Sequence, residues 1–176
     1  DAFPDFEIAM LQRGYTLCFV SHPTRWAPDS ETKVMAEFVK FVAAELGVEP
    51  KVIAIGMSCG GLQAARLAEL YPELVSVLYL DAPVVNFMSC PCGFGVGRPL
   101  AENNDEILQA LGLDSISQLL AYREMPLDKL PQLVQHRIPL ILVAGDSDQV
   151  VPYCENGVFV EQAYRQAGIE LEVYIK

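Results

Sequence analysis

The sequence predicts an α/β protein, a three-layer α/β/α sandwich built on a mostly parallel sheet. Short continuous apolar runs with the length of buried strands alternate with segments whose apolar residues keep helical spacing. Hydrophobic residues make up 52% of the chain, as expected when strands are covered on both faces. The alternation of strand and helix implies parallel pairing with right-handed crossovers.

The first part of the chain contains two expected helices separated by an apolar run. Residues 5–13 keep helical spacing and are followed by a glycine, which is a common helix end. Residues 15–20 form a continuous apolar run and are predicted to be a buried strand. A second helix is expected over residues 29–46, where Asp29 or Ser30 can cap the N-terminus.

Strand, helix and strand follow. Residues 51–56 are an apolar run, residues 63–70 are compatible with a helix that Tyr71-Pro72 ends, and residues 75–80 form the next predicted strand. Beyond the insertion described next, the expected elements are a strand, a loop, a helix and a last strand, over residues 138–144, 145–152, 155–166 and 170–175.

The alternation breaks between residues 84 and 137. Glycine and proline make the first part of this segment an irregular loop, and short amphipathic helices are expected over residues 105–111, 115–122 and 127–135. By analogy with other insertions of this length, we expect residues 84–137 to form a cap-like insertion over the active site.

Length and charge exclude several classes of function. At 176 residues the chain suits one domain with a sizeable core. It carries 12 basic and 23 acidic residues, a net charge of −11, which argues against a nucleic-acid surface. No apolar run reaches the ~18 to 20 residues of a membrane span. We expect a cytoplasmic protein with no nucleic-acid or membrane partner, although a leader could have preceded the first residue.

The five cysteines are an odd number and fit a reducing compartment. Cys90 and Cys92 could form half of a metal or redox site. No second pair of cysteine or histidine residues stands at ligand spacing, so we expect no metal and no cofactor.

The most informative motif is Gly56-Met57-Ser58-Cys59-Gly60-Gly61, which lies between a predicted strand and a predicted helix. A strand that turns sharply into a helix needs small residues on both sides of the turn, and the glycines supply them. In this nucleophile-elbow pattern the turn lifts Ser58 above the end of the sheet. We therefore predict that Ser58 is a nucleophile and that the backbone N–H of Cys59 is the first oxyanion donor.

A serine hydroxyl is a poor nucleophile unless a histidine takes its proton and an acid orients that histidine. Asp148 is the predicted acid, because it follows strand 138–144 at the edge where catalytic groups of open α/β sheets gather. Asp81, after the neighbouring strand, and Asp146, which can hydrogen-bond the backbone of its own turn, are the alternatives. All three could also be ordinary turn carboxylates.

Neither histidine of the chain suits the role of base. His136 precedes its strand and therefore belongs to the edge opposite Ser58, whereas His22 is at the correct edge but precedes the elbow. In this arrangement the partners follow in the order serine, acid, histidine. We expect His22 to make a loop hydrogen bond or to line the pocket, and we expect the base and the second oxyanion donor to be missing from this chain.

These residues resemble the α/β-hydrolase superfamily. The resemblance rests on the elbow, on Leu80-Asp81-Ala82-Pro83-Val84 and on residues 145–152. More narrowly, these segments are similar to those of bacterial serine hydrolases of the prolyl-oligopeptidase-like or esterase-like type. It implies an α/β-hydrolase core over essentially all 176 residues and a catalytic triad. Cys59 stands where such relatives often carry arginine.

The relatives continue beyond both ends of this sequence, with an oxyanion loop before it and a loop rich in glycine and histidine after it. We therefore interpret the sequence as the middle of a longer hydrolase. The chain alone is expected to be inactive and to expose apolar sheet surface.

The function predicted is a serine hydrolase that cleaves a small-molecule carboxylic ester through an acyl-enzyme on Ser58. A serine peptidase of the prolyl-oligopeptidase type and a non-catalytic α/β-hydrolase-like binding protein are the alternatives. A nucleotide-binding domain fits poorly, because the glycines cluster around Ser58 and not in a phosphate-binding loop.

Overall fold

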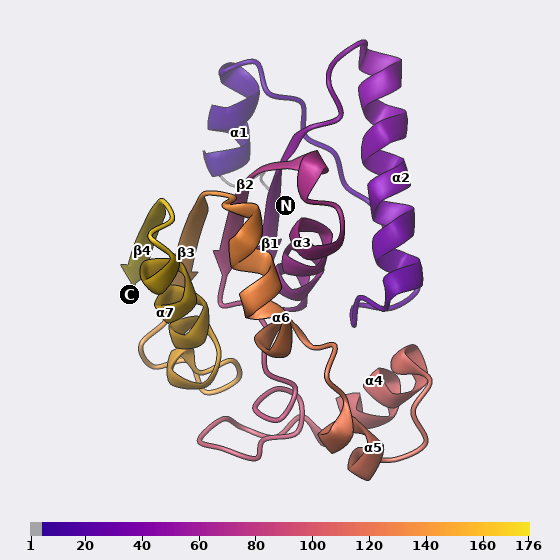
Figure 1. Ribbon diagram of the computed structural model, residues 1–176, viewed down its shortest axis with the longest axis vertical. Helices are drawn as coiled ribbons and strands as arrows, with labels where there is room; N and C mark the ends of the chain where they lie inside the picture. Colours follow the sequence, from indigo (N-terminus) through magenta and orange to yellow (C-terminus); the bar gives the residue numbers. More distant parts are fainter. Residues whose placement is uncertain (1–4) are drawn as a thin grey trace.

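The computed structural model describes residues 5–176, whose strands form one parallel sheet in chain order (Figure 1). The strands are β1 (Val52–Met57), β2 (Val75–Asp81), β3 (Leu140–Ala144) and β4 (Leu171–Ile175). Gly56 is opposite Leu80, and Leu80 is opposite Leu142, so the carboxyl ends of β1, β2 and β3 meet at one edge. The predicted α/β class and its parallel sheet are confirmed.

One face of the sheet is covered by helices. These are α2 (Asp29–Leu46), α3 (Cys59–Leu70), α6 (Pro126–Leu133) and α7 (Gly157–Ala167). Alternate strand residues point into this layer, and Leu78, Leu80, Leu140 and Leu142 are at most 1% exposed. Each such side chain contributes roughly 1.5 to 3 kcal/mol relative to an exposed one, so this face forms the main core.

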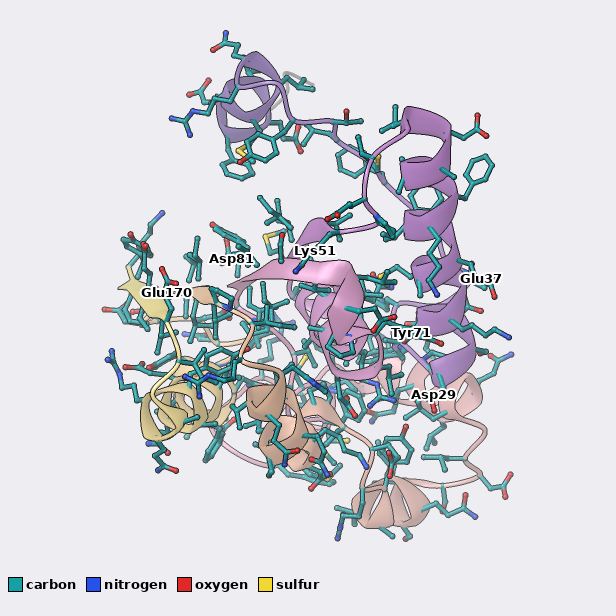
Figure 2. All side chains as sticks on the ribbon, turned by 45° about the horizontal axis from the view of Figure 1, so that its top comes forward. Asp29, Glu37, Lys51, Tyr71, Asp81 and Glu170 are labelled. Atoms are coloured by element: carbon teal, nitrogen blue, oxygen red, sulfur yellow. The ribbon has the colours of Figure 1, made fainter. Side chains whose placement is uncertain are left out.

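The other face of the sheet is only partly covered. Among the described residues, α1 (Asp5–Gln12) forms the third layer, and its Phe6 ring stacks on Tyr79 with centroids 6.1 Å apart. In Figure 2, α1 lies on the side of the sheet opposite α6 and α7. Ile55 and Met57 of β1 are 45% and 69% exposed. The chain therefore exposes apolar sheet surface, as the sequence led us to expect.

The predicted strand over residues 15–20 is wrong. This segment has no strand structure, and Phe19 is 73% exposed. An apolar run becomes a strand only where a sheet edge accepts and donates its backbone hydrogen bonds. Among the described residues β1 pairs with β2 alone, and residues 15–20 do not lie along its other, unpaired edge, so they form no ladder.

Two predicted helix starts are also displaced. The helix after the elbow begins at Cys59 and not at residue 63, because Leu62 N–H already donates to the Ser58 carbonyl at 3.2 Å. The helix predicted from residue 155 begins at Gly157, after a short 3-10 turn, η4 (Tyr153–Glu155). A second 3-10 turn, η1 (Pro72–Leu74), leads into β2.

Residues 84–137 divide into two parts. A loop is followed by η2 (Ala101–Asn103), α4 (Asn104–Leu111), α5 (Ile116–Ala121), α6 and η3 (Val134–His136). Helices α4 and α5 lie beyond the carboxyl edge of the sheet (Figure 1), where they bury Ile107 and Leu119 against Trp26, Leu62 and Phe87. Helix α6 instead packs with α3 and α7 in the layer over the sheet. The end of the expected insertion is thus part of the core.

Candidate active site

The elbow is a strained turn at the carboxyl end of β1. Ser58 has φ 54° and ψ −121°, which a non-glycine residue rarely adopts, and α3 begins at the next residue. Ser58 N–H donates to the carbonyl of Asp81 at 2.9 Å, and the Ser58 carbonyl accepts from Val84 N–H at 3.1 Å. These bonds hold the strained residue to the end of the neighbouring strand.

Close backbone packing explains the glycines around Ser58. A Cβ on Gly61 would lie 2.8 Å from both Cα and Cβ of Pro83, so α3 can approach the end of β2 only with glycine there. A Cβ on Gly56 would meet the first turn of α3. The glycines of the motif are therefore required because the backbone of α3 packs directly against the end of β1 and against Pro83 after β2.

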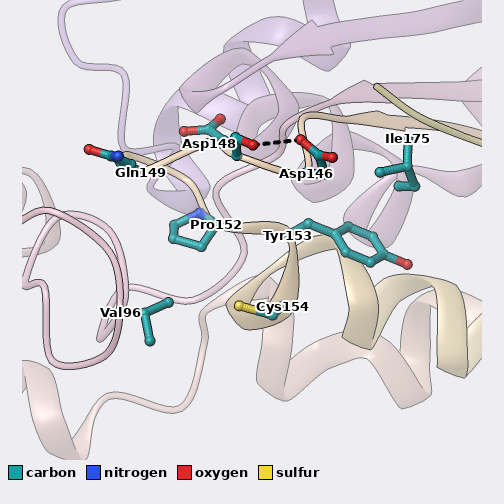
Figure 3. Close-up of a pocket in the computed structure, with 9 residues that line it drawn as sticks. Val96, Asp146, Asp148, Gln149, Pro152, Tyr153, Cys154 and Ile175 are labelled. Carbon is teal, nitrogen blue, oxygen red and sulfur yellow. Dashed lines mark hydrogen bonds between the residues drawn. The ribbon is translucent and has the colours of Figure 1, made fainter.

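Asp148 lies in the loop after β3, at the same edge of the sheet as Ser58. Its Oδ1 accepts the N–H groups of Val150 at 2.8 Å and Val151 at 2.9 Å. Its other oxygen accepts no hydrogen bond from the described residues. Asp148 and Asp146 both line an open hollow of about 390 Å³ (Figure 3).

The hydrogen bonds of Asp146 differ from the expected ones. Asp146 Oδ1 accepts from the Ser147 hydroxyl at 2.7 Å, whereas the backbone of the turn is bonded by Asp148. Asp146 is exposed, and its N–H donates to the Lys176 carbonyl at 2.8 Å, beside the end of β4. The expectation that Asp146 would hydrogen-bond the backbone of its own turn is therefore wrong, although both carboxylates remain at this edge.

Asp81 is the last residue of β2, opposite Met57 and Val143. Its side chain belongs to the partly covered face, which it shares with Tyr79. Burial, and secondly the negative charge of Asp81, raise the pKa of Tyr79. Asp81 thus lies at the correct edge but on the face that α1 covers.

Neither histidine hydrogen-bonds to Ser58 or Asp148 in residues 5–176. His22 Nδ1 lies 3.2 Å from Glu31 Oε2, and the imidazole is 4% exposed. The expected loop hydrogen bond of His22 is therefore present. His136 is exposed and lies in η3, before the amino end of β3 and so away from Ser58.

The thiols near Ser58 are held in the protonated form. Burial raises the pKa of Cys59, and the positive charge of Arg25 opposes this. Burial also raises the pKa of Cys90 to about 12, and the negative charge of Asp148 adds to the shift. Cys90 also belongs to a buried cluster that contains Val151 of the Asp148 loop and packs against Cys59 of the elbow. Neither cysteine is a ready thiolate nucleophile.

Sequence reasoning missed two groups of polar residues near the carboxyl edge of the sheet. Arg25 Nη2 pairs with Glu106 Oε2 at 2.7 Å, and its guanidinium lies 5.8 Å from the Trp26 ring centroid, so the loop after residue 20 is tied to α4. Glu155 and Asn156 bind the loop after β2. No single motif marks these residues, because their partners are distant in the sequence.

Within residues 5–176, no group of three or more histidine, cysteine, aspartate or glutamate side chains is arranged to hold a metal ion. Over the same residues, no helix combines the length and the apolar character needed to cross a membrane.

A protein-family model described as "alpha/beta hydrolase fold" matches residues 18–111, which is more than half of the chain. The chain belongs to this family. A search of curated proteins found no significant match.

Solved structures show the same fold. A putative dipeptidyl aminopeptidase IV from Bacteroides ovatus covers 87% of this chain at 20% identity and a TM-score of 0.63. Acylaminoacyl peptidase from Pyrococcus horikoshii matches 81% of this chain at 16% identity, with a TM-score of 0.62. MPT51 from Mycobacterium tuberculosis matches 82% of this chain at 19% identity, with a TM-score of 0.57. The chain spans only 20%, 22% and 58% of these three proteins.

Proposed function

We propose that the protein is a serine hydrolase that cleaves a carboxylic ester through an acyl-enzyme on Ser58. The observation that carries the proposal is the strained Ser58 turn between β1 and α3. It lies at the edge of the sheet where the Asp148 loop begins after β3. Holding a serine at φ 54° costs of order 1 to 3 kcal/mol, and such strain concentrates at functional sites.

The first N–H groups of α3 supply an electrostatic reason for catalysis at this place. The N–H groups that begin a helix have no carbonyl partner within the helix, and the helix dipole favours negative charge there. Cys59 N–H is the first of these groups and follows the nucleophile directly. A donor of this kind stabilises the oxyanion of a tetrahedral intermediate by roughly 3 to 4 kcal/mol.

Asp148 is the proposed acid of the triad. Its Oδ1 is used to hold its own loop, and Oδ2 remains to orient an imidazole. We propose that this imidazole is not one of the two in this chain, because His22 is engaged with Glu31 and His136 lies beyond the opposite edge. The end of β4 lies beside the Asp148 loop, because Asp146 N–H donates to the Lys176 carbonyl at 2.8 Å.

The reaction then follows the acyl-enzyme route. The base removes the proton of Ser58 Oγ as this oxygen attacks the ester carbonyl, and Cys59 N–H binds the oxyanion. Collapse of the intermediate breaks the bond to the alcohol, which leaves with the proton from the base. Water, activated by the same base, attacks the acyl-enzyme and releases the acid.

Labelling with a fluorophosphonate probe tests the proposal in the protein expressed from its complete reading frame. We expect a covalent adduct on Ser58, and none in Ser58→Ala. Ser115→Ala is the matched control, because the Ser115 hydroxyl serves to cap α5 by accepting from Gln118 N–H, and its loss should leave labelling unchanged. An intact, folded protein without a Ser58 adduct would count against a serine hydrolase and in favour of a binding protein.

Peptide hydrolysis is the second candidate, because two of the structural neighbours are described as an aminopeptidase and an acylaminoacyl peptidase. Both structures are several times longer than this chain. Parallel assays with p-nitrophenyl esters and peptide p-nitroanilides distinguish the two: the ester proposal expects turnover of esters with anilides slower by orders of magnitude. Comparable turnover of both would favour the peptidase.

A further inference from the structure

The side chain of Glu155 binds the loop that follows β2. Its carboxylate accepts hydrogen bonds from the Ser89 hydroxyl at 2.7 Å, Val96 N–H at 2.6 Å and Gly97 N–H at 3.3 Å. Charge-assisted hydrogen bonds of this kind are the strong ones. They are also long-range, because Glu155 follows β3 while its partners follow β2.

Asn156 adds a second set of bonds to the same loop. Its side chain is buried, and its Oδ1 accepts from Val85 N–H at 3.2 Å and Asn86 N–H at 3.1 Å. Its Nδ2 donates to Ser89 Oγ and to the carbonyl of Pro152, each at 3.2 Å. Both polar atoms of this buried amide therefore have partners. Through these bonds Asn156, which follows β3, is joined to the loop after β2.

Residues 93–98 lie directly against Glu155 and the Asp148 loop. A Cβ on Gly95 would lie 1.7 Å from Glu155 Oε1, so only glycine permits the observed approach. Gly97 packs on Pro152, and Arg98 N–H donates to the Gln149 carbonyl at 2.5 Å. The hydrogen bonds thus hold residues 93–98 beside the proposed acid.

The loop presents one apolar side chain to each of two hollows. Val96 is 75% exposed and lines the hollow of about 390 Å³ that Asp146 and Asp148 also line (Figure 3). Phe94 is 61% exposed and lines a separate hollow of about 120 Å³, on the side of Phe159. Val96 is therefore the loop side chain placed to meet a substrate near Asp148.

We propose that Glu155 and Asn156 are positioning residues that hold residues 93–98 as a wall of the active site, where Val96 contacts an apolar group of the ester substrate. The proposal rests on the proposed serine hydrolase function. Its physical basis is that a loop held by several hydrogen bonds loses little further freedom when a substrate binds. A released loop would have to be ordered by the substrate, which weakens binding of substrates that use the contact.

Hydrogen exchange tests the hydrogen-bond part without any activity. In the protein expressed from its complete reading frame, Glu155→Ala should speed exchange of the Val96 and Gly97 amides at least about tenfold, as expected for loss of hydrogen bonds to a charged acceptor. Glu155→Gln should give a smaller increase, since an amide oxygen still accepts one bond. Glu170→Gln, at an exposed position, is the control and should change nothing.

Kinetics test the substrate contact, with p-nitrophenyl acetate and p-nitrophenyl octanoate as substrates. We expect Val96→Ala to lower kcat/KM for octanoate relative to acetate by about fivefold, mostly through KM, as expected for loss of methyl groups that a bound octanoyl chain would cover. Glu155→Gln should shift the ratio in the same direction. Phe94→Ala, on the same loop but facing the other hollow, should leave the ratio unchanged.

The outcomes separate the two proposals. Unchanged amide exchange in Glu155→Ala overturns the positioning role, and an unchanged octanoate-to-acetate ratio in Val96→Ala overturns the substrate contact. If Glu155→Ala does not fold, the exposed Val96→Ala and Phe94→Ala pair still decides the contact. Absence of Ser58 labelling overturns the hydrolase and the contact with it, while faster exchange would still support the hydrogen-bonded loop.

Discussion

A Cβ atom on Gly56 would lie 2.0 Å from the carbonyl oxygen of Gly60. The end of β1 and the first turn of α3 are therefore in backbone contact on either side of Ser58. No side chain can be inserted between them without moving the strand or the helix. This contact keeps the serine at the sharp end of the turn.

Gly56→Ala is expected to lower the free energy of unfolding by about 3 kcal/mol or more, because overpacking against backbone cannot be relieved by a rotamer change. Gly60→Ala is the matched control. A Cβ there meets nothing within 4 Å, and the residue lies inside α3, so this change should be neutral or stabilising by up to about 1 kcal/mol. Urea denaturation of both variants checks this; equal effects would contradict the packing argument.

Under the proposed function, with Asp148 as the acid of the triad, Asp148→Asn should lower kcat for ester hydrolysis by roughly 10⁴-fold, because an amide cannot hold the imidazole in the required tautomer. The asparagine keeps an oxygen that can accept from Val150 and Val151, so the loop should stay folded. Asp146→Asn and Asp81→Asn, assayed in parallel, should each retain most of the activity. A large loss in Asp81→Asn with little loss in Asp148→Asn would assign the acid to β2 instead.

Arg66→Met should lower the free energy of unfolding by about 3 to 5 kcal/mol, the usual cost of removing one partner from a buried ion pair. The Arg66 side chain is 3% exposed, and it pairs with Asp29 and with Glu69, at 2.6 Å from Glu69 Oε2. Burial raises the pKa of Glu69, and Arg66 opposes this, so the variant leaves a buried carboxylate without its counter-ion.

The double variant R66M/E69L separates charge burial from packing. If the cost of Arg66→Met comes from the uncompensated Glu69, the double variant should recover most of the lost stability. Thermal and urea unfolding measure both variants. A double variant as unstable as Arg66→Met would show that the arginine acts through its own packing.

The stability that Glu155 contributes should depend on pH. Hydrogen bonds from Ser89, Val96 and Gly97 hold the pKa of Glu155 below its usual range, although partial burial opposes them. A carboxyl whose pKa is lower in the folded state stabilises the fold above its unfolded pKa of about 4.3 and loses this contribution as pH falls through the folded pKa. The stability difference between wild type and Glu155→Gln should therefore be full at pH 6 and shrink below about pH 4.3.

Unfolding curves for both proteins between pH 3 and pH 7 provide the measurement, with Glu170→Gln as a control for general acid effects. A difference that stays constant across this range would contradict a carboxylate that is hydrogen-bonded in the folded state.

Local patterns in the sequence were sufficient for most elements of the fold. The elbow motif, the helical spacing of residues 29–46 and the apolar runs of β1, β2 and β3 each contain their own structural information, because turn geometry and burial act over a few residues. They predicted the parallel sheet, the place of Ser58 and the edge at which Asp148 lies.

The tertiary structure decided what depends on partners distant in the chain. Residues 15–20 are an apolar run like β1 but form no strand, because the fold does not place their backbone along the free edge of β1. Residues 84–137 were expected to form one insertion, but their last helix, α6, packs in the layer over the sheet. In the sequence nothing distinguishes Glu155 from an ordinary residue before a helix. Its hydrogen bonds with Ser89 and Val96 form only because the fold brings these residues to it. Sequence determines local conformation and burial; which side chains meet across loops is set by the packing of the whole chain.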